Sequence, residues 1–446
     1  PTGICTYEHL VKERDYKKIV PRCIEVRGVK VKISEIPIPV SYSAAFEGER
    51  VRREQMHIQF GGKYTEAFEY VRVKELDQVE DGKIELIGPE IDDAKEEAAL
   101  PLGMLIEVAG RKMQKEFEPI LERQVHSFLN EAMGIFHMGQ RDVCWLRISK
   151  NAHKKGFKIK HFGTILHARM HDTFGAIVDK VQVTIYTKAE DVEKHITEAK
   201  QAYEGRDARM AGMTDESVDT FYSCTLCQSF APNHICIVKP ERLGLCGAYT
   251  WLDAKACFEL DPTGPNQPIK KGECLDPVRG EWKNVNEFIH QKSNQSLERF
   301  HGYSVITYPE TSCGCFECIL AILPEANGFM IVNREYSGMT PCGMSFSTLA
   351  GTVGGGAQTP GFMGIGRLYV VSKKFISAEG GLKRVVWMPK GLKEALGERL
   401  IKRCAEEGDP DLINKIADEN VATTSEELLK HLEEKGHPAL TLPPLM

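Results

Sequence analysis

Long apolar segments are missing from this sequence of 446 residues. No apolar run approaches the roughly 18 residues that a membrane-spanning helix needs, so we expect no membrane-embedded part. The first residues, PTGICTYEHLVKERDYKK, contain no apolar core of a signal peptide. An excess of positive charge is missing too, because the formal net charge is −6. General nucleic-acid binders are usually basic, and the sequence therefore argues against nucleic acid as a partner.

A secretory use of cysteine is also not indicated. The chain has fourteen cysteines but no visible export signal, and such cysteines are typically thiols or metal ligands rather than disulfides. We therefore expect a protein of a reducing, anaerobic cytoplasm. Its hydrophobic content of 42% and charged content of 27% are those of an ordinary globular protein.

A phosphate-binding loop is absent from the most glycine-rich stretch, which covers residues 351–366. No G-x-x-x-x-G-K-[ST] pattern fits there, and no strand–helix setting for a dinucleotide fingerprint is evident. Two interpretations stay open. The glycines form a set of tight turns, or they let the backbone pass close to a metal site.

What the chain does contain is a dense cysteine group. Cys224, Cys227, Cys236 and Cys246 follow a C-x2-C-x8-C-x9-C pattern among prolines and glycines. Thiolates select zinc, copper(I) or iron–sulfur clusters. A zinc ribbon would show a second C-x2-C pair, which these gaps do not supply. The spacing therefore favours a cubane [4Fe–4S] cluster over zinc.

A second group, Cys313-Gly314-Cys315, is shorter and more unusual. Two thiolates and the amide nitrogens between them can surround one metal in a plane, and glycine removes the Cβ that would crowd it. Such planar donor sets are typical of Ni(II) or Cu(II). Alone, the triplet is more often two buried cysteines beside a turn. Beside a four-cysteine group, it favours a metal.

These segments carry a family resemblance. SCTLCQSFAPNHICIVKPERLGLCGAYTWLDAKA and PETSCGCFECI closely resemble the acetyl-CoA synthase subunit of the carbon monoxide dehydrogenase/acetyl-CoA synthase complex. The resemblance extends from about Cys23 to the C-terminus. The N-terminal domain of bacterial members is not seen, and a naturally short form and an expressed fragment both stay open.

The resemblance implies the ligands of the metal centre. A [4Fe–4S] cluster would be held by Cys224, Cys227, Cys236 and Cys246. A labile proximal nickel would bind the sulfurs of Cys227, Cys313 and Cys315. A square-planar distal nickel would take the sulfurs of Cys313 and Cys315 and the amide nitrogens of Gly314 and Cys315. Phe230 would shield the open face of the proximal nickel.

The resemblance also implies an acyltransferase. It would condense a methyl group from a methylated corrinoid iron–sulfur protein with carbon monoxide and coenzyme A. Carbon monoxide would come from the carbon monoxide dehydrogenase subunit, and ferredoxin is a possible further partner. The alternatives are a [4Fe–4S] electron-transfer protein without nickel and a zinc-stabilised binding module.

The predicted fold class is α+β (mixed α/β) in two domains. Residues 1–29 are a lead-in, 30–203 a middle α+β domain for coenzyme A, 204–212 a linker, and 213–446 the metal-cluster catalytic domain with a mixed sheet and flanking helices. Periodicity predicts strands near residues 29–33 and 181–185 and helices over 113–133 and 192–203. Pro389 is expected in the first turn of a helix, and Thr424 should cap another that ends at Gly436.

The segment 141–161 is strongly basic, since seven lysines and arginines against one aspartate give +6. Arginine suits phosphate and tryptophan stacks on a base, so Arg141, Trp145, Arg147 and Lys150 are candidate contacts for coenzyme A. The residues alone favour a solvated loop with a core tryptophan, and the resemblance reverses that order. Nearby, His167 and His171 are interpreted as sharing one helix face rather than binding a metal.

Overall fold

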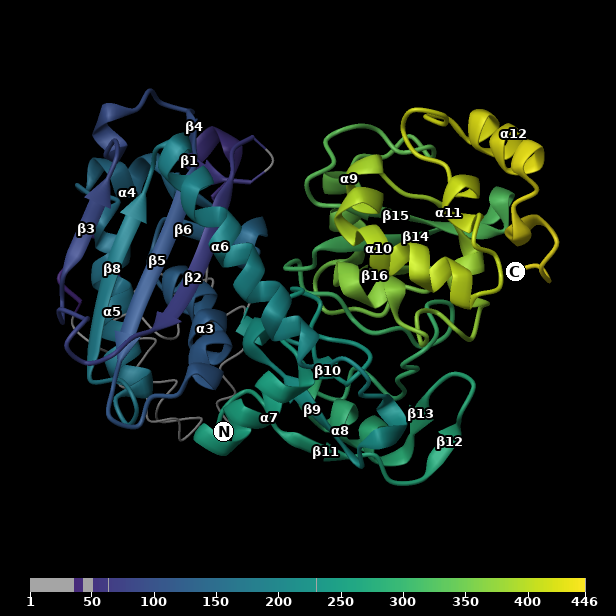
Figure 1. The fold of residues 1–446 in the computed structure, drawn as a ribbon, viewed down its shortest axis with the longest axis horizontal. Coiled ribbons are helices and arrows are strands. Elements are labelled where there is room, and N and C mark those ends of the chain that lie inside the picture. Colours follow the sequence, from purple (N-terminus) through teal and green to yellow (C-terminus); the bar gives the residue numbers. More distant parts are fainter. Residues whose placement is uncertain (1–35, 43–50, 63, 230, 446) are drawn as a thin grey trace, which may run out of the picture.

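The computed structural model describes residues 36–42, 51–62, 64–229 and 231–445. Figure 1 shows three lobes: one at the left from the first half of the chain, one at the bottom from the middle, and one at the upper right from the C-terminal part. The fold class is mixed α/β, as expected. Among the described helices, none combines the length and apolarity needed to span a bilayer. The strand expected near residues 29–33 lies outside the described residues.

Two four-stranded sheets build the first lobe. One has the order β2-β5-β8-β3, with β2(Ala67–Val73) parallel to β5(Leu102–Ala109), β5 antiparallel to β8(Lys180–Tyr186), and β8 parallel to β3(Ile84–Ile87). The other has the order β4-β1-β7-β6 and consists of β4(Ala99–Leu100), β1(Met56–Gly61), β7(Trp145–Ser149) and β6(Ile135–Met138). The helices among the described residues of this lobe are α3(Glu118–Asn130), α4(Lys150–Lys154), α5(Lys160–Phe174) and α6(Ala189–Ala208).

Helix α3 is central to this lobe and to its neighbour. It packs on β2, β6 and α5, and also on α7(Trp251–Leu260) of the bottom lobe. The predicted helix over residues 113–133 is thus confirmed, but it is shorter at both ends. Pro119 at the start is compatible with a first turn because its missing N–H would have no intrahelical partner. The predicted strand over residues 181–185 is β8.

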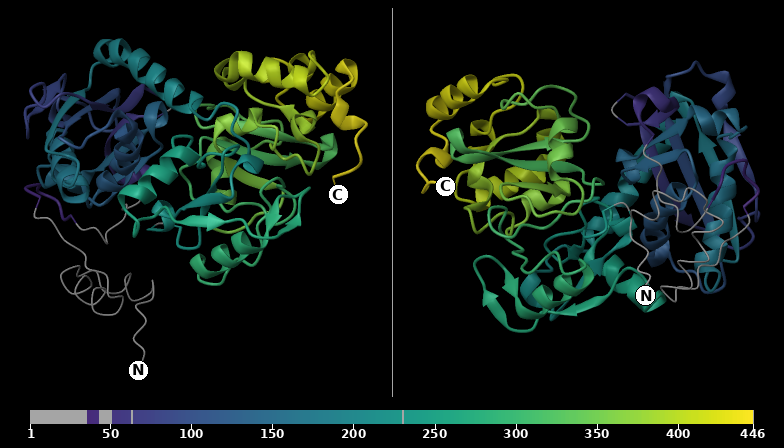
Figure 2. Two further views of the ribbon diagram at one scale, coloured as in Figure 1. Left: turned by 60° about the horizontal axis from the view of Figure 1, so that its bottom comes forward. Right: turned by 180° about the vertical axis from the view of Figure 1, so that it is seen from behind.

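The predicted linker begins inside a helix. Helix α6 covers the expected span from Val192 to Tyr203 and continues to Ala208, so residues 204–208 of the predicted linker are helical, while the domain boundary stays a prediction. Buried Arg206 explains the extension, because its guanidinium donates to Glu122 at 2.8 Å and to Glu118 at 3.1 Å. These ion pairs hold the last turn against α3. Figures 1 and 2 show α6 running out of the first lobe toward the others.

The segment predicted as the catalytic domain contains the other two lobes. The bottom lobe has the sheet β10-β9-β11, the hairpin β12-β13 and two helices. The upper lobe has the mixed sheet β16-β14-β15-β17 and four helices among the residues described. Their bounds are β9(Thr220–Cys224), β10(Cys236–Val238), β11(Pro268–Lys270), β12(Cys274–Asp276), β13(Glu281–Trp282), α8(Lys283–Lys292), β14(Cys318–Leu323), β15(Gly328–Asn333), α9(Phe346–Val353), β16(Phe362–Ile365), β17(Val385–Trp387), α10(Lys390–Glu406), α11(Leu412–Lys415) and α12(Ser425–Lys435).

The C-terminal elements follow the predicted signals closely. Thr424 and Glu427 form the capping box of α12, and Gly436 takes the left-handed conformation that ends it. Pro389 is the residue before α10 rather than part of its first turn. The last residues form a strap, since Asn327 donates to the carbonyls of Ala439 and Leu442, each at 2.9 Å.

Candidate metal centre

The first four cysteines lie where a strand pair meets a loop. Cys224 ends β9 and Cys236 begins β10, and the two residues are direct partners across this antiparallel pair. Cys227 lies in a short 3₁₀ turn, Leu226–Ser229, that follows β9. Cys246 lies in a turn closed by Gly247 N–H donating to Gly244 O at 2.9 Å. All four side chains are buried, so the hairpin and two turns gather them away from solvent.

The Cys313-Gly314-Cys315 segment joins this group immediately before β14. The Sγ atoms of Cys227, Cys313 and Cys315 all lie within 4.8 Å of one another. Cys315 N–H lies 3.3 Å from Cys313 Sγ, so an amide nitrogen faces the same sulfur set. The adjoining backbone is fastened to the turn of Cys246, because Glu317 N–H donates to Leu245 O at 3.2 Å. The fold therefore brings the two cysteine groups together.

Gly314 owes its identity to backbone conformation. Its φ of 146° lies in a region that L side chains rarely adopt. Apart from its chain neighbours, a Cβ at this position would meet Met138 Cε at 3.6 Å, an ordinary contact, so the backbone conformation rather than crowding by other segments favours glycine. Arg334 Nη2 donates to Gly314 O at 2.9 Å and to Phe316 O at 2.7 Å, which fixes both carbonyls. The segment is thus fixed in an unusual conformation at the metal centre.

The glycine-rich run passes against the same segment. Gly356 N–H donates to Ser312 O at 2.9 Å, and Gly355 N–H lies 3.4 Å from Cys313 O. A Cβ on Gly356 would approach His234 N to 2.9 Å, closer than real side chains come. Of the two interpretations left open by the sequence, the close approach of backbone to the cysteine site is confirmed here.

Helix α3 of the first lobe covers the sulfurs. Arg123 Nη2 and His126 Nε2 lie 3.5 Å from Cys227 Sγ and Cys315 Sγ, respectively. Both side chains are buried. The Nε and Nη1 atoms of Arg123 have no hydrogen-bond partner among the residues that the structure describes. Burial alone would lower the pKa of Arg123, but the sulfurs of Cys246 and Cys227 raise it well above its usual range. A buried cation with two nitrogens unpartnered among the described residues therefore faces the cysteines, whose sulfurs stabilise its charge.

The pKa values of the cysteine thiols are shifted in different directions. Burial raises the pKa of Cys224 to about 12 and also raises the pKa of Cys246. Hydrogen bonds with Cys227 and Cys315 hold the pKa of Cys313 well below its usual range. All twelve cysteines that the structure describes are free thiols. Because metal binding needs thiolates, a bound cation would displace the remaining protons.

Three further contacts were not anticipated from the sequence. Besides Arg123 and His126, His234 Nε2 lies 3.2 Å from Cys236 Sγ, and its Nδ1 lies 2.9 Å from Thr311 Oγ1. His234 precedes a ligand cysteine by two residues, which is a usable signal. Arg123 and His126 lie three residues apart on a predicted helix, but nothing in the sequence links that helix to the cysteines.

Of the residues predicted to contact coenzyme A, only some lie together. Trp145 and Met138 are direct partners across β7 and β6, and Arg147 stacks on the Trp145 ring at 4.8 Å. Met138 Sδ lies 4.0 Å from Cys315 Sγ, so this aromatic and basic face leads to the sulfurs. Lys150, on the next element, is exposed and pairs with Glu96 at 2.7 Å.

Arg141 has a different environment. Its guanidinium is buried, donates to Asp207 at 3.0 Å and donates to Gly247 O at 3.2 Å. It therefore fastens α6 to the turn that carries Cys246, and its surroundings do not resemble an open phosphate site. Phe230, the predicted shield, lies outside the described residues.

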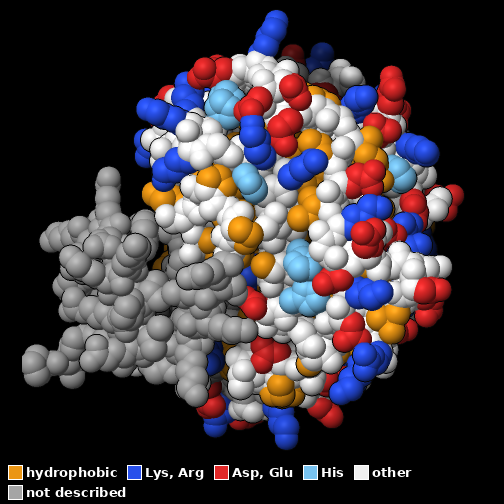
Figure 3. Space-filling view, turned by 90° about the vertical axis from the view of Figure 1, so that its left-hand side faces the viewer, with side chains coloured by type: hydrophobic (Ala, Val, Ile, Leu, Met, Phe, Trp, Pro, Cys, Tyr) orange, Lys and Arg blue, Asp and Glu red, His pale blue; other side chains and the backbone are white. Residues whose placement is uncertain are grey.

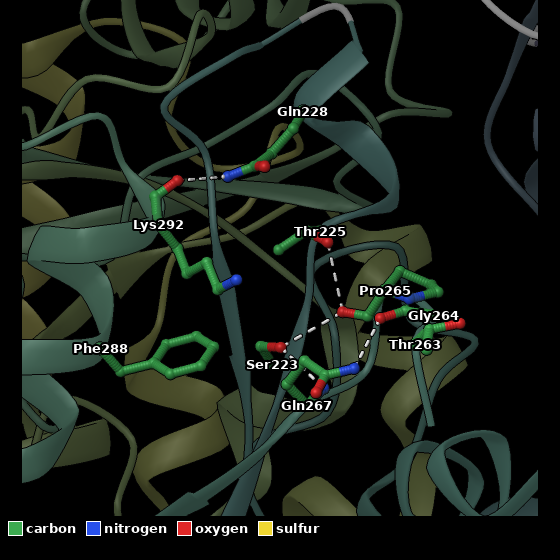
Figure 4. Close-up of a pocket in the computed structure, with 9 residues that line it drawn as sticks. All are labelled: Ser223, Thr225, Gln228, Thr263, Gly264, Pro265, Gln267, Phe288 and Lys292. Carbon is green, nitrogen blue, oxygen red and sulfur yellow. Dashed lines mark hydrogen bonds between the residues drawn. The ribbon is translucent and has the colours of Figure 1, made fainter. Parts of the chain in front are cut away.

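Two pockets border this region without reaching its sulfurs. One, with a volume of about 580 Å³, lies beside the outer wall of the cysteine loop and is lined by residues that include Ser223, Thr225 and Lys292 (Figure 4). The other, of about 470 Å³, lies between the first and upper lobes beside Asp142 and Arg367. Neither is lined by any of the six cysteines, so the buried centre is distinct from both hollows.

Comparison with known proteins covers nearly the whole chain. The family described as CO dehydrogenase/acetyl-CoA synthase complex beta subunit matches residues 38–192. The family described as the C-terminal part of the ACS/CODH beta subunit matches residues 203–446.

Several curated relatives are similar over most of this chain. The carbon monoxide dehydrogenase/acetyl-CoA synthase subunit alpha of Moorella thermoacetica is 55% identical over 97% of this chain and 59% of its own length. The acetyl-CoA decarbonylase/synthase complex subunit beta of Methanopyrus kandleri is 44% identical over 90% of this chain and 85% of its own length. Subunit beta 1 of the complex in Methanocaldococcus jannaschii is 42% identical over 96% of this chain and 56% of its own length. The chain thus spans little more than half of two of these three relatives.

A solved structure of the C-terminal domain of an acetyl-coenzyme A synthase alpha subunit is 63% identical. The match covers 30% of this chain and 100% of the solved chain, with a TM-score of 0.29.

Proposed function

The chain belongs to the family of CO dehydrogenase/acetyl-CoA synthase complex beta subunits, and on this basis we propose that it is an acetyl-CoA synthase. It would join a methyl group, carbon monoxide and coenzyme A. The observation that carries the proposal is the meeting of Cys227 with Cys313 and Cys315, whose sulfurs lie within 4.8 Å of one another. An ordinary cluster-binding loop would need no second pair of thiols beside its own.

The residues present fit the metal groups that the family implies. Cys224, Cys227, Cys236 and Cys246 would hold a [4Fe–4S] cluster. Cys227, Cys313 and Cys315 would hold the proximal nickel, and Cys313, Cys315 and the amides of Gly314 and Cys315 the distal one. The buried cation of Arg123, with two nitrogens that lack a partner in the described part of the chain, supports an anionic group at this position. When bound, nickel would supply the soft, vacant coordination positions at which C–C and C–S bonds form, which no side chain offers.

The chain's own contribution is a dry enclosure that places a cation beside the sulfurs. All six cysteines are buried, and α3 contacts two of the three that would share nickel, Cys227 and Cys315. Excluding water strengthens the interaction between Arg123 and the sulfurs, because charges attract more strongly at low dielectric. His234 and Arg334 hold Cys236 and the Gly314 backbone in place. These contacts orient the sulfurs before any metal arrives.

Coenzyme A would lie along the face of β6 and β7. Trp145 would stack on the adenine, while Arg147 and Lys150 would approach its phosphates. The thiol end would then run toward Met138, which contacts Cys315. Arg141 enters this proposal as a positioning residue, since its guanidinium joins α6 to the Cys246 turn.

The partners follow from the same family. Carbon monoxide would be delivered by a carbon monoxide dehydrogenase subunit, and the methyl group by a methylated corrinoid iron–sulfur protein. Ferredoxin is a further candidate for supplying electrons. The setting would be an anaerobic cytoplasm.

Metal analysis of anaerobically purified protein tests this function. We expect about four iron and about two nickel ions per chain, with acetyl-CoA formed from the three substrates. Iron without a nickel requirement would instead identify an electron-transfer protein. Zinc without iron, and without cluster absorption near 400 nm, would identify a zinc-stabilised binding module.

A further inference from the structure

A second group of metal-ligand side chains lies on the first lobe, away from the cysteines. His167 and His171 are one turn apart on α5, and their Nε2 atoms lie 3.0 Å and 2.9 Å from the same Asp81 Oδ1. The helical face predicted for the two histidines is thus observed, but no sequence pattern pointed to Asp81 as their neighbour. Figure 3 views the molecule from the side of this lobe, where histidine side chains lie at the surface among acidic ones.

We propose that Asp81, His167 and His171 form a binding site for a divalent transition-metal ion, separate from the cysteine centre. This site goes beyond the proposed function and does not depend on it. Two imidazoles and one carboxylate suit Zn²⁺ or Ni²⁺, because imidazole is a good ligand for both ions.

The geometry fits such an ion with small adjustments. The three ligand atoms all lie within 4.8 Å of one another. A tetrahedral ion with bonds of about 2.0–2.1 Å places its ligand atoms about 3.3 Å apart. The two separations of 3.0 Å and 2.9 Å are therefore about 0.3 Å and about 0.4 Å too short. The side chains are partly exposed, at 30% for each histidine and 43% for Asp81, so they can open by this amount. Solvent can supply the remaining ligand.

The surrounding backbone holds Asp81 in position. Val181 N–H donates to Asp81 Oδ1 at 3.0 Å, and Gly82 N–H donates to Val181 O at 2.9 Å. The turn that carries Asp81 is therefore fastened to the first residues of β8, and α5 packs on β8 and β3. Partial burial would raise the pKa of Asp81, but hydrogen bonds from Val181 and both histidines lower it to about 2. An ionised carboxylate fixed by the backbone, with two imidazoles one helical turn apart beside it, is a largely preformed site.

His153 provides a matched comparison in the same lobe. Its Nε2 lies 2.9 Å from Asp92 Oδ1, so it makes the same kind of histidine–aspartate contact. However, the other oxygen of Asp92 pairs with the ammonium group of Lys158. A cation bound there would be repelled by Lys158. We therefore expect His153 to be irrelevant to metal binding.

Calorimetric titration of Zn²⁺ into the full chain, with the cysteine centre already loaded, tests the proposal. The wild type should take up about one further ion, and His167→Gln and Asp81→Asn should each weaken that binding at least about tenfold. His153→Gln should bind like the wild type. X-ray absorption of the added zinc should show nitrogen and oxygen ligands without sulfur.

Three results would overturn the assignment. One is the absence of uptake beyond the cysteine centre in the wild type. The others are uptake in His167→Gln or Asp81→Asn with wild-type affinity, and zinc surrounded by sulfur. All three target side chains are partly exposed, so the variants should fold, and unchanged far-UV circular dichroism would confirm this.

Discussion

Replacing Arg123 by methionine should make the midpoint potential of the proposed cluster more negative. The same change should raise the free energy of unfolding of the apoprotein. Methionine keeps a flexible side chain of similar reach but removes the charge. Arg123 Nη2 lies 3.5 Å from Cys227 Sγ, and two of its other nitrogens have no partner among the described residues. At an effective dielectric of about 20, unit charges at about 4 Å attract by about 4 kcal/mol. Charge on a cluster is spread further away, so we expect about 2–4 kcal/mol.

The reduced cluster carries one more negative charge and is therefore stabilised most by Arg123. Removing the guanidinium should make the midpoint potential about 80–170 mV more negative, since about 1.4 kcal/mol corresponds to 59 mV for one electron. Without metal, the thiols are largely protonated and the buried cation is poorly compensated. The apoprotein should then gain about 1–4 kcal/mol of stability in Arg123→Met.

Potentiometric titration of the loaded protein and urea unfolding of the apoprotein measure the two quantities. Arg169→Met is the control, because Arg169 pairs with Glu131 at 3.2 Å rather than with sulfur. That variant should leave the potential unchanged and should destabilise the apoprotein, since Glu131 loses its cation. An Arg123→Met protein with the wild-type potential and no gain in apoprotein stability would refute this account of Arg123.

Four further results are expected. Cys236→Ala should lower the iron content and abolish acetyl-CoA synthesis, and full iron content would remove Cys236 from the ligand set. Trp145→Ala should weaken coenzyme A binding by about 1–3 kcal/mol, or about five- to 150-fold, while methyl transfer to the metal continues; unchanged affinity would place coenzyme A elsewhere. A mild chelator should remove about one nickel per chain, with a loss of activity that added nickel alone restores. The Cys227→Ser variant should retain only the distal nickel. Simultaneous loss of both ions would contradict the distinction between a labile proximal and a retained distal nickel. Burial lowers the pKa of His437 to about 4, so its contribution of up to about 3 kcal/mol should be present above about pH 6.5 and lost as the pH falls toward 4. Urea unfolding at these pH values should show a smaller difference in His437→Asn.

Short-range sequence patterns correctly predicted the helices and strands whose conformation depends mainly on neighbouring residues. The alternation of Val181, Val183 and Ile185 identified β8, and the Thr424 capping box identified the start of α12. The cysteine spacing likewise pointed to a shared metal site, because ligands close in sequence can reach one ion without knowledge of the fold. The domain boundaries and the metal identities stay predictions.

Contacts between distant segments were beyond the reach of the sequence. Arg123 and Cys227 meet only because α3 packs on α7 of the neighbouring lobe. The helical conformation of residues 204–208 was not predicted because these residues are polar, while the ion pairs of Arg206 with Glu118 and Glu122 keep them helical. Asp81 was missed as a partner of the histidines for the same reason, since its turn reaches α5 only through β8.

Because α3 lies over the sulfurs, the binding of metal and the association of the lobes are thermodynamically coupled. Arg123 and His126 belong to the first lobe, whereas the cysteines belong to the others. Linkage is reciprocal. If these contacts strengthen metal binding, metal binding must strengthen the docking of the first lobe by the same free energy. A chain that has acquired its metals should therefore favour the closed arrangement, and an empty chain should open more readily. Access for large partners and retention of the metals would then be in thermodynamic competition within a single polypeptide.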